Sequence, residues 1–338
     1  MLSFNKKLTD VYKVIQGDML RINEELKSHL RTKYSYLEDL NDYFLSWGGK
    51  RIRPALVMLS ARTIAPGNLE DKDMDLLILL SAAVELIHSA SLIHDDIIDN
   101  SPLRRNKSTI HKRWGREAAV AFGDYIYSKA FELVANCSRP DVLGCVAQAT
   151  TAMCEGQLFQ VLERKNLNLK KSEYIVIVKK KTASLIAACC KGAALIIDKE
   201  AKDKHSALAA YGLNFGIAFQ IVDDYLDIMA QRNVLGKISG QDISSGELTL
   251  PLYDLIDSLN KKDKKGIKDM LGAQDITADV IAGIRDKIKD KKTYLKTKER
   301  ALFYARRSKD KLNEFPDSCY KDRLSDLADY VVDRGFKN

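Results

Sequence analysis

Apolar residues recur at intervals of three and four residues along almost the whole chain. This spacing places them on one face of an α-helix, whereas a half-buried strand alternates apolar and polar residues. The stretch from Met74 to Asp99 follows the helical pattern with Leu77, Leu80, Val84 and Ile87. Alternating patterns are nearly absent, and EYIVIVKKK continues into the helical KTASLIAACC. The pattern predicts an all-α protein with roughly ten or more helices of ordinary length.

Helix-breaking residues are sparse, with 6 prolines and 18 glycines in 338 residues. Nowhere do Pro, Gly and Ser gather into a linker, so we expect a single domain over residues 1–338. The two most apolar windows, DLLILLSAAVELIH and LIAACCKGAALII, contain Glu85 and Lys191 and are shorter than the ~20 residues of a transmembrane helix. Both are therefore predicted to be buried core helices.

Cysteine usage and the amino terminus indicate a cytoplasmic protein. The 6 cysteines show no CxxC spacing, and the first twenty residues lack the apolar stretch of a signal peptide. We expect reduced thiols that pack as small apolar core residues. The net charge is +8, with lysines concentrated in the last third. Because these lysines alternate with Asp and apolar residues at helical spacing, they predict a solvated helix face and no nucleic-acid partner.

Two acidic clusters interrupt the apolar pattern. HSASLIHDDIIDNSPLRR places Asp95, Asp96 and Asp99 at the end of a long helix, which Pro102 is expected to end at about Ser101. Carboxylates there oppose the helix dipole, and Asp95 and Asp99 repel one another one turn apart. Both effects are unfavourable unless a cation balances them.

The same arrangement recurs in FGIAFQIVDDYLDIM, which carries Asp223, Asp224 and Asp227. A single DDxxD motif is often a solvated acidic turn, but two copies at the ends of apolar helices favour a metal site. Carboxylate oxygens suit Mg²⁺, which typically bridges protein carboxylates to substrate phosphates. The six aspartates are therefore predicted to bind magnesium.

Basic residues near these clusters could hold an anionic substrate directly, although each alone could be an ordinary surface charge. They are Lys50, Arg53, Arg104, Arg105, Lys181 and Lys237. Together with the metal clusters they predict a pocket for two diphosphates. His88 and His94 lie six residues apart on different faces of one helix, so they do not form a zinc pair, and His94 is expected to be structural.

The motifs GGKRIRP, HDDIIDNSPLRR, KTASL, FQIVDDYLD and GKISGQD…TLPL follow one another between about residues 44 and 255. On these motifs the chain resembles the trans-isoprenyl diphosphate synthases, the polyprenyl synthetase family. The resemblance implies a large orthogonal helical bundle around a deep central cavity, usually as a homodimer. It also implies three magnesium ions per active site, an all-trans prenyl product and peripheral membrane contact for product release.

The resemblance also implies residue roles. Isopentenyl diphosphate would be bound by Lys50, Arg53, His88 and Arg105. The allylic diphosphate would be held through magnesium on the six aspartates and directly by Arg104, Lys181 and Lys237. Thr182 and Gln220 would border the developing carbocation, and Gln160 would lie near the metals. Two positions depart from the family pattern: Glu247 replaces a diphosphate-binding lysine, and Gln157 replaces a glutamate.

The implied reaction is ionisation of the allylic C–O bond, attack by isopentenyl diphosphate and loss of a proton. The proton acceptor is left open, with released diphosphate as one candidate. Head-to-head synthases and terpene cyclases also use acidic helix motifs, but they do not need the cations of GGKRIRP. A non-catalytic subunit of a heteromeric synthase usually lacks one acidic cluster, whereas this chain has both.

Product length is predicted from the residues that precede the first cluster. Ser91 and Ala90 lie about one turn before Asp95, ~5–7 Å along the helix axis. Small side chains there leave room for a growing tail, which predicts a hexaprenyl to decaprenyl product. A farnesyl or geranylgeranyl product is the alternative, and close helix packing is the alternative role of the two small residues.

Overall fold

The structure is a computed structural model that describes residues 6–229, 240–273 and 276–336. Within these ranges it is helical apart from one hairpin of two-residue strands, so the predicted all-α class is confirmed. The helices are α1 Lys6–Lys13, α2 Gln16–His29, α3 Ser35–Leu45, α4 Ile52–Ile64, α5 Asp71–Ile98, α6 Ile110–Trp114, α7 Arg116–Asn136, α8 Pro140–Leu162, α9 Lys171–Val178, α10 Ser184–Ile197, α11 Lys202–Met229, α13 Gln241–Ser244, α14 Leu250–Ser258, α15 Lys261–Leu271, α16 Ala278–Asp290, α17 Tyr294–Asp310 and α18 Cys319–Asp333. A π-helical turn, η1 Lys179–Ala183, joins α9 to α10, and a 3₁₀ turn, η2 Lys311–Glu314, follows α17.

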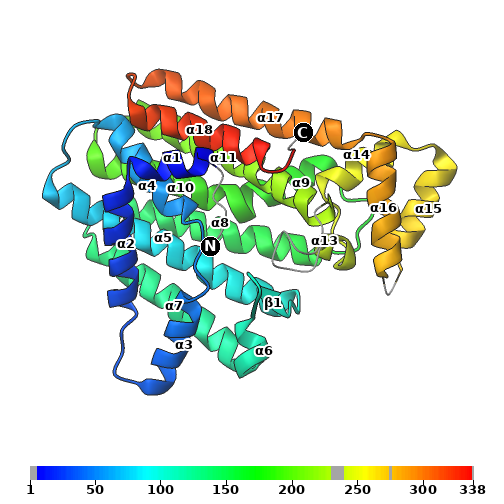
Figure 1. Cartoon of the computed structure of the whole chain (residues 1–338), viewed down its shortest axis with the longest axis horizontal. Coiled ribbons are helices and arrows are strands. Elements are labelled where there is room, and N and C mark those ends of the chain that lie inside the picture. Colours follow the sequence, from blue (N-terminus) through cyan, green and yellow to red (C-terminus); the bar gives the residue numbers. More distant parts are fainter. Residues whose placement is uncertain (1–5, 230–239, 274–275, 337–338) are drawn as a thin grey trace.

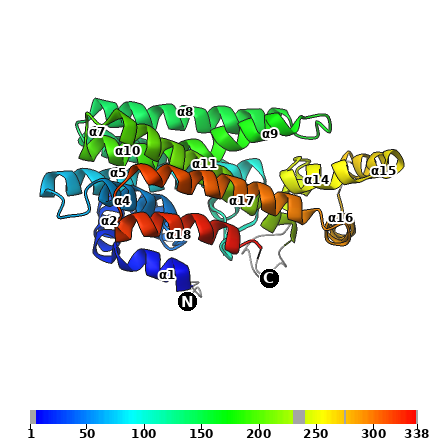
Figure 2. The ribbon, with the colours of Figure 1, turned by 90° about the horizontal axis from the view of Figure 1, so that it is seen from above.

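The long helices are stacked in layers (Figures 1 and 2). Seen from above, α8 lies along one edge, α10, α11 and α17 follow in the middle, and α18 and α1 lie toward the other edge (Figure 2). The central helix α10 packs on α4, α8 and α11, and α11 packs on α17. Helices α14, α15 and α16 gather at one end of the stack (Figure 1).

Helix α5 is a core element. Leu77, Leu80, Val84 and Ile87 recur at helical spacing and are fully buried. The helix is long and apolar enough to cross a membrane by length and composition, but 72% of its most apolar window is buried within the fold. The predicted core helix is thus confirmed, and it extends three residues before the expected start at Met74.

Glycines let three helices approach at the centre of the stack. A methyl group on Gly156 of α8 would lie 2.5 Å from the backbone nitrogen of Lys181 in η1. A methyl group on Gly216 of α11 would lie 2.6 Å from the Cα of Ala183, on the opposite side of the same turn. Carbon atoms do not approach backbone so closely, so the π-helical turn is held between α8 and α11 only because both positions lack a side chain.

One expectation needs correction, and a second one holds. Cys154 and Cys319 are exposed, so not every cysteine is a core residue; both occupy outer faces of helices, while Cys189 and Cys190 are buried. The expectation that the lysine-rich segments form solvated helix faces holds for α15, where Ile267 and Leu271 are buried and most lysines are exposed.

We expect Gly216→Ala to destabilise the fold, because its methyl group meets backbone rather than a flexible side chain. Overpacking of this kind costs about 1–3 kcal/mol. Gly283→Ala is the matched control, since Gly283 also lies inside a helix but has nothing within 4 Å of the added methyl group. Thermal unfolding should show a lower midpoint for Gly216→Ala and an equal or higher one for Gly283→Ala. Equal midpoints in both variants would contradict the close approach.

Candidate active site

The first acidic cluster lies at the carboxyl end of α5. The helix ends at Ile98 with Asp99 as its C-cap, about three residues before the predicted end. The Asp99 amide donates to the carbonyl of Asp95 at 2.8 Å, and the Ser101 amide donates to the carbonyl of Asp96 at 2.9 Å. The terminal turn is therefore well formed, although three carboxylates lie on it.

A hairpin of β1 (Leu103–Arg104) and β2 (Lys107–Ser108) supplies the cation for Asp96. Its two central residues, Arg105 and Asn106, both have positive φ, as a two-residue hairpin turn favours. This geometry directs Arg104 back onto the buried Asp96, with its Nη2 2.6 Å and its Nε 2.8 Å from the carboxylate oxygens. Burial raises the pKa of Asp96, and the contacts from Arg104 partly offset that rise.

The second acidic cluster lies on the last turns of α11. Asp224 is buried and accepts hydrogen bonds from Tyr174 at 2.6 Å and from Gln220 at 2.7 Å. Gln220 in turn accepts from the Thr182 hydroxyl at 2.7 Å, which completes a chain from η1 to α9. Burial raises the pKa of the Asp224 carboxyl, because the two donors offset only part of the desolvation.

The two other carboxylates of this cluster have different partners. Arg334, after the end of α18, forms an ion pair with Asp223 at 2.8 Å, and its guanidinium lies 4.0 Å from the ring centre of Phe219. Asp227 is buried and accepts from the backbone amide of Asp242 at 3.1 Å. Helix α13 is thus tied to the carboxyl end of α11.

Lys181 and Arg164 contact the first acidic cluster, on α5, in addition to Arg104. Lys181, in η1, lies 3.8 Å from Asp95. Arg164, just after α8, contacts Asp99 and also forms an ion pair with Glu247 at 2.9 Å. Gln160 donates to Glu247 as well. The carboxylate of Glu247 is therefore paired with an arginine.

A second group of cations surrounds His88 on α5. Burial and the positive charges of Arg53, Arg105, Arg104 and Arg51 lower the pKa of His88 well below its usual range. The Nε of Arg53 is buried and has no hydrogen-bond partner among the residues that the structure describes. This concentration of positive charge, together with a buried donor that is unsatisfied among the described residues, is suited to an anion that the protein itself does not provide.

One buried carboxylate organises this group. Glu85 accepts from Arg51 at 2.7 Å, and Arg51 itself has positive φ at the start of α4. Positive φ at Gly48 and Gly49 brings this loop against the hairpin, where the guanidinium of Arg105 contacts the Gly48 carbonyl. The exposed Lys50 donates to the Tyr330 hydroxyl at 2.9 Å.

The acidic residues fit a metal that is partly bound by substrate. In the described part of the chain, no group of three or more His, Cys, Asp or Glu side chains could hold a metal unaided. Hard carboxylate oxygens from two helices nevertheless match magnesium, which keeps several waters and takes phosphate oxygens as further ligands. The aspartates would have to exchange protein cations for the metal.

The structure brings together many of the predicted residues, as pairs Asp95–Lys181 and Asp96–Arg104 and as the chain Thr182–Gln220–Asp224. Lys237 lies outside the described residues. His94 contacts the Val120 carbonyl on α7 at 3.3 Å, as expected of a structural residue. The roles of all these predicted site residues in binding metal and substrate stay predictions, as does the central cavity.

Sequence reasoning did not find Tyr174, Arg164 or Arg334. Each lies in a segment without a distinctive motif and reaches its carboxylate from another part of the chain. The only signal in the sequence was Glu247, a charge reversal that demands a cation nearby.

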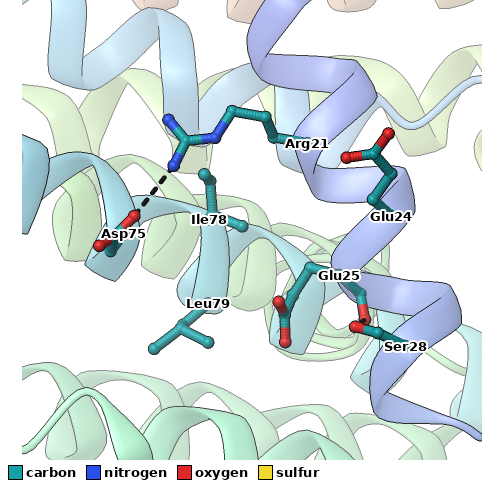
Figure 3. Close-up of a pocket in the computed structure, with 7 residues that line it drawn as sticks. All are labelled: Arg21, Glu24, Glu25, Ser28, Asp75, Ile78 and Leu79. Atoms are coloured by element: carbon teal, nitrogen blue, oxygen red, sulfur yellow. Dashed lines mark hydrogen bonds and ion pairs between the residues drawn. The ribbon is translucent and has the colours of Figure 1, made fainter.

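A separate pocket of about 440 Å³ lies between α2 and α5 and is lined by Arg21, Glu24, Glu25, Ser28, Asp75, Ile78 and Leu79 (Figure 3). Arg21 pairs with Asp75 across it at 2.9 Å. Asp75 precedes Asp95 by twenty residues of one helix, or about 30 Å. This pocket is therefore remote from the acidic clusters.

Comparison with known proteins gives consistent matches. The family model described as polyprenyl synthetase matches residues 34–288. The chain is 32% identical to an octaprenyl diphosphate synthase of Haemophilus influenzae, over 97% of this chain and 98% of that protein. It is 33% identical to a short chain isoprenyl diphosphate synthase of Methanothermobacter thermautotrophicus, over 87% and 89%. A crystal structure of a polyprenyl synthase from Caulobacter crescentus, complexed with calcium and isoprenyl diphosphate, superposes with a TM-score of 0.91, 32% identity and coverage of 97% and 98%.

Proposed function

The chain belongs to the polyprenyl synthetase family, and on that basis we propose that it joins isopentenyl diphosphate head to tail to an allylic prenyl diphosphate. The observation that carries the proposal is the arrangement of charge. The acidic ends of α5 and α11 are paired with Lys181, Arg104 and Arg334. A second group, in which arginines outnumber the buried carboxylate of Glu85, surrounds His88 on the same helix α5. A diphosphate bound through metal ions would occupy the acidic region, and a diphosphate bound directly by cations would occupy the region around His88.

The allylic site is proposed at the acidic clusters, with the six aspartates as ligands of about three Mg²⁺ ions in all. Bound magnesium would stabilise negative charge on the departing diphosphate. Lys181, partly buried in the turn η1, supplies a positive charge for the same purpose. Thr182 and Gln220 present oxygen dipoles next to Asp224, where a developing allylic cation would be favoured.

The isopentenyl diphosphate site is proposed at Lys50, Arg53, His88 and Arg105. A neutral His88 can donate one hydrogen bond and adds no further charge to the arginines around it. Arg53 keeps an unpaired donor there among the described residues. The alkene would then approach the allylic carbon from the side of α5 that carries both sites.

We also propose that the product is long, in the hexaprenyl to decaprenyl range. Ala90 is fully buried on α5, and the Ser91 hydroxyl is bonded to the His88 carbonyl at 2.7 Å, so neither side chain projects far. The octaprenyl diphosphate synthase of Haemophilus influenzae supports this length, while the short chain relative keeps the farnesyl or geranylgeranyl alternative open.

A homodimer is proposed on the outer face of α7 and α8. Large apolar side chains are exposed along this face: Val120 at 45%, Leu143 at 37%, Leu158 at 62% and Leu162 at 79%. Figure 2 shows that α8 forms an edge of the molecule, where a second copy could cover them. We further propose one catalytic domain, cytoplasmic, with peripheral membrane contact when the apolar product leaves.

Asp95→Asn and Asp223→Asn should reduce turnover by at least about 100-fold, because each removes several kcal/mol of transition-state stabilisation. The unfolding midpoint should change little, since both carboxylates are only partly buried. Asp141→Asn, which alters an ion pair at the start of α8, is the control. Turnover is measured with isopentenyl diphosphate, an allylic diphosphate and saturating Mg²⁺. Near-normal turnover in either variant would refute the metal assignment.

Lys50→Ala and Arg53→Gln should raise the KM for isopentenyl diphosphate about ten- to a hundredfold, as expected for loss of a charge-assisted hydrogen bond. The KM for the allylic substrate should change far less, because its proposed site lies at the acidic clusters. Arg21→Gln, in the remote pocket, is the control. Equal increases of both KM values would show that the two substrates are not separated in this way.

Ala90→Tyr and Ser91→Phe should shorten the product if the tail grows along α5. Leu79→Phe is the matched control, because Leu79 lies on the same helix α5 but lines the remote pocket beside Arg21. Reversed-phase chromatography of the reaction products gives the chain length. Unchanged length in both variants would place the limiting residues on other helices.

A further inference from the structure

Arg164 and Glu247 form a linked pair between two loops. The Nε of Arg164 lies 3.0 Å and its Nη2 2.9 Å from one carboxylate oxygen of Glu247. The loops are also joined through the backbone, because the amide of Lys165 donates to the carbonyl of Gly246 at 2.8 Å. Gly246 has positive φ, and a methyl group on it would lie 2.6 Å from the Lys165 side chain. The pair is therefore part of a fixed junction.

The junction faces the proposed allylic site. The Nη2 of Arg164 also contacts Asp99, and the neighbouring Lys181 contacts Asp95. Glu247 is 10% exposed and Arg164 is 21% exposed at the side chain. A partly buried pair of this kind contributes little stability compared with apolar packing, so its position next to an acidic cluster calls for a functional explanation.

The guanidinium can serve two partners at once. It carries five N–H donors in a plane, and Glu247 is bound along one edge through Nε and Nη2. When a metal takes Asp99, Arg164 can keep Glu247 and offer Nη donors to a phosphate oxygen. Planar, paired donors match phosphate better than the single point charge of a lysine.

We propose that Arg164 binds the allylic diphosphate directly and that Glu247 is the residue that positions it. This inference rests on the proposed function and deepens it. A neutral Glu247–Arg164 pair then provides directed hydrogen bonds where a lysine would provide net charge. The departure at position 247 is a replacement of one binding group by another, rather than a loss.

The test is a double-mutant cycle of Arg164→Gln, Glu247→Gln and the two together. Binding of inorganic diphosphate with Mg²⁺ is measured by calorimetry, alongside both KM values and the unfolding midpoint. Arg164→Gln should weaken diphosphate binding about ten- to a hundredfold and raise only the allylic KM. Glu247→Gln should have a smaller effect of the same kind, and the double variant should bind no better than Arg164→Gln.

A purely structural pair predicts the opposite, because removing both partners leaves no unpaired buried charge. Restored diphosphate binding in the double variant, or unchanged binding in Arg164→Gln, would overturn the inference. Arg139→Gln is the matched control, as it breaks an ion pair at the other end of α8. If Arg164→Gln does not fold, Arg164→Lys is measured instead: weaker binding is expected, and undiminished binding would overturn the inference. An unaltered chain that cannot join the two diphosphates would instead refute the proposed function.

Discussion

Mutual repulsion among carboxylates at the ends of α5 and α11 is the constraint around which the rest of the molecule is arranged. Each cluster opposes its own helix dipole, so neither helix end is favourable alone. The balancing cations come from distant segments: the hairpin supplies Arg104, η1 supplies Lys181, and the carboxyl end of α18 leads to Arg334. The negative charges of the two acidic clusters are therefore fully balanced only when the whole stack of helices has assembled.

The fold class and the acidic clusters could be predicted because both depend on local pattern. Helical periodicity identified α5 and α11, and repeated DDxxD motifs identified their ends. Tyr174 and Arg164 could not be predicted in the same way, because they bond to residues fifty or more positions away. The hairpin was also missed, since strands of two residues are too short to show alternation.

Helix α5 sets the distance between the two proposed substrate sites. His88 and Asp95 are seven residues apart, which is nearly two full turns and about 10 Å along the axis. They therefore lie on the same side of one rigid, buried helix. In the proposed reaction, the isopentenyl and allylic diphosphates would be held apart by the length of helix between His88 and Asp95. Their relative placement along α5 would therefore not depend on loop closure.

The π-helical turn η1 has a consequence for which changes of length the chain can tolerate. A π-helical turn holds more residues than an α-helical one, because its hydrogen bonds span five residues rather than four. About five residues of a π-helical turn cover the same rotation as four residues of an α-helix, so deleting one residue between 179 and 183 would restore an ordinary turn with α9 and α10 in nearly their present relative orientation. Inserting one further residue would instead rotate α9 by about 100° relative to α10. Tyr174 would then point away from Asp224. The turn is therefore expected to tolerate loss of one residue outside Lys181 and Thr182 better than gain of one, which would separate the two halves of the site.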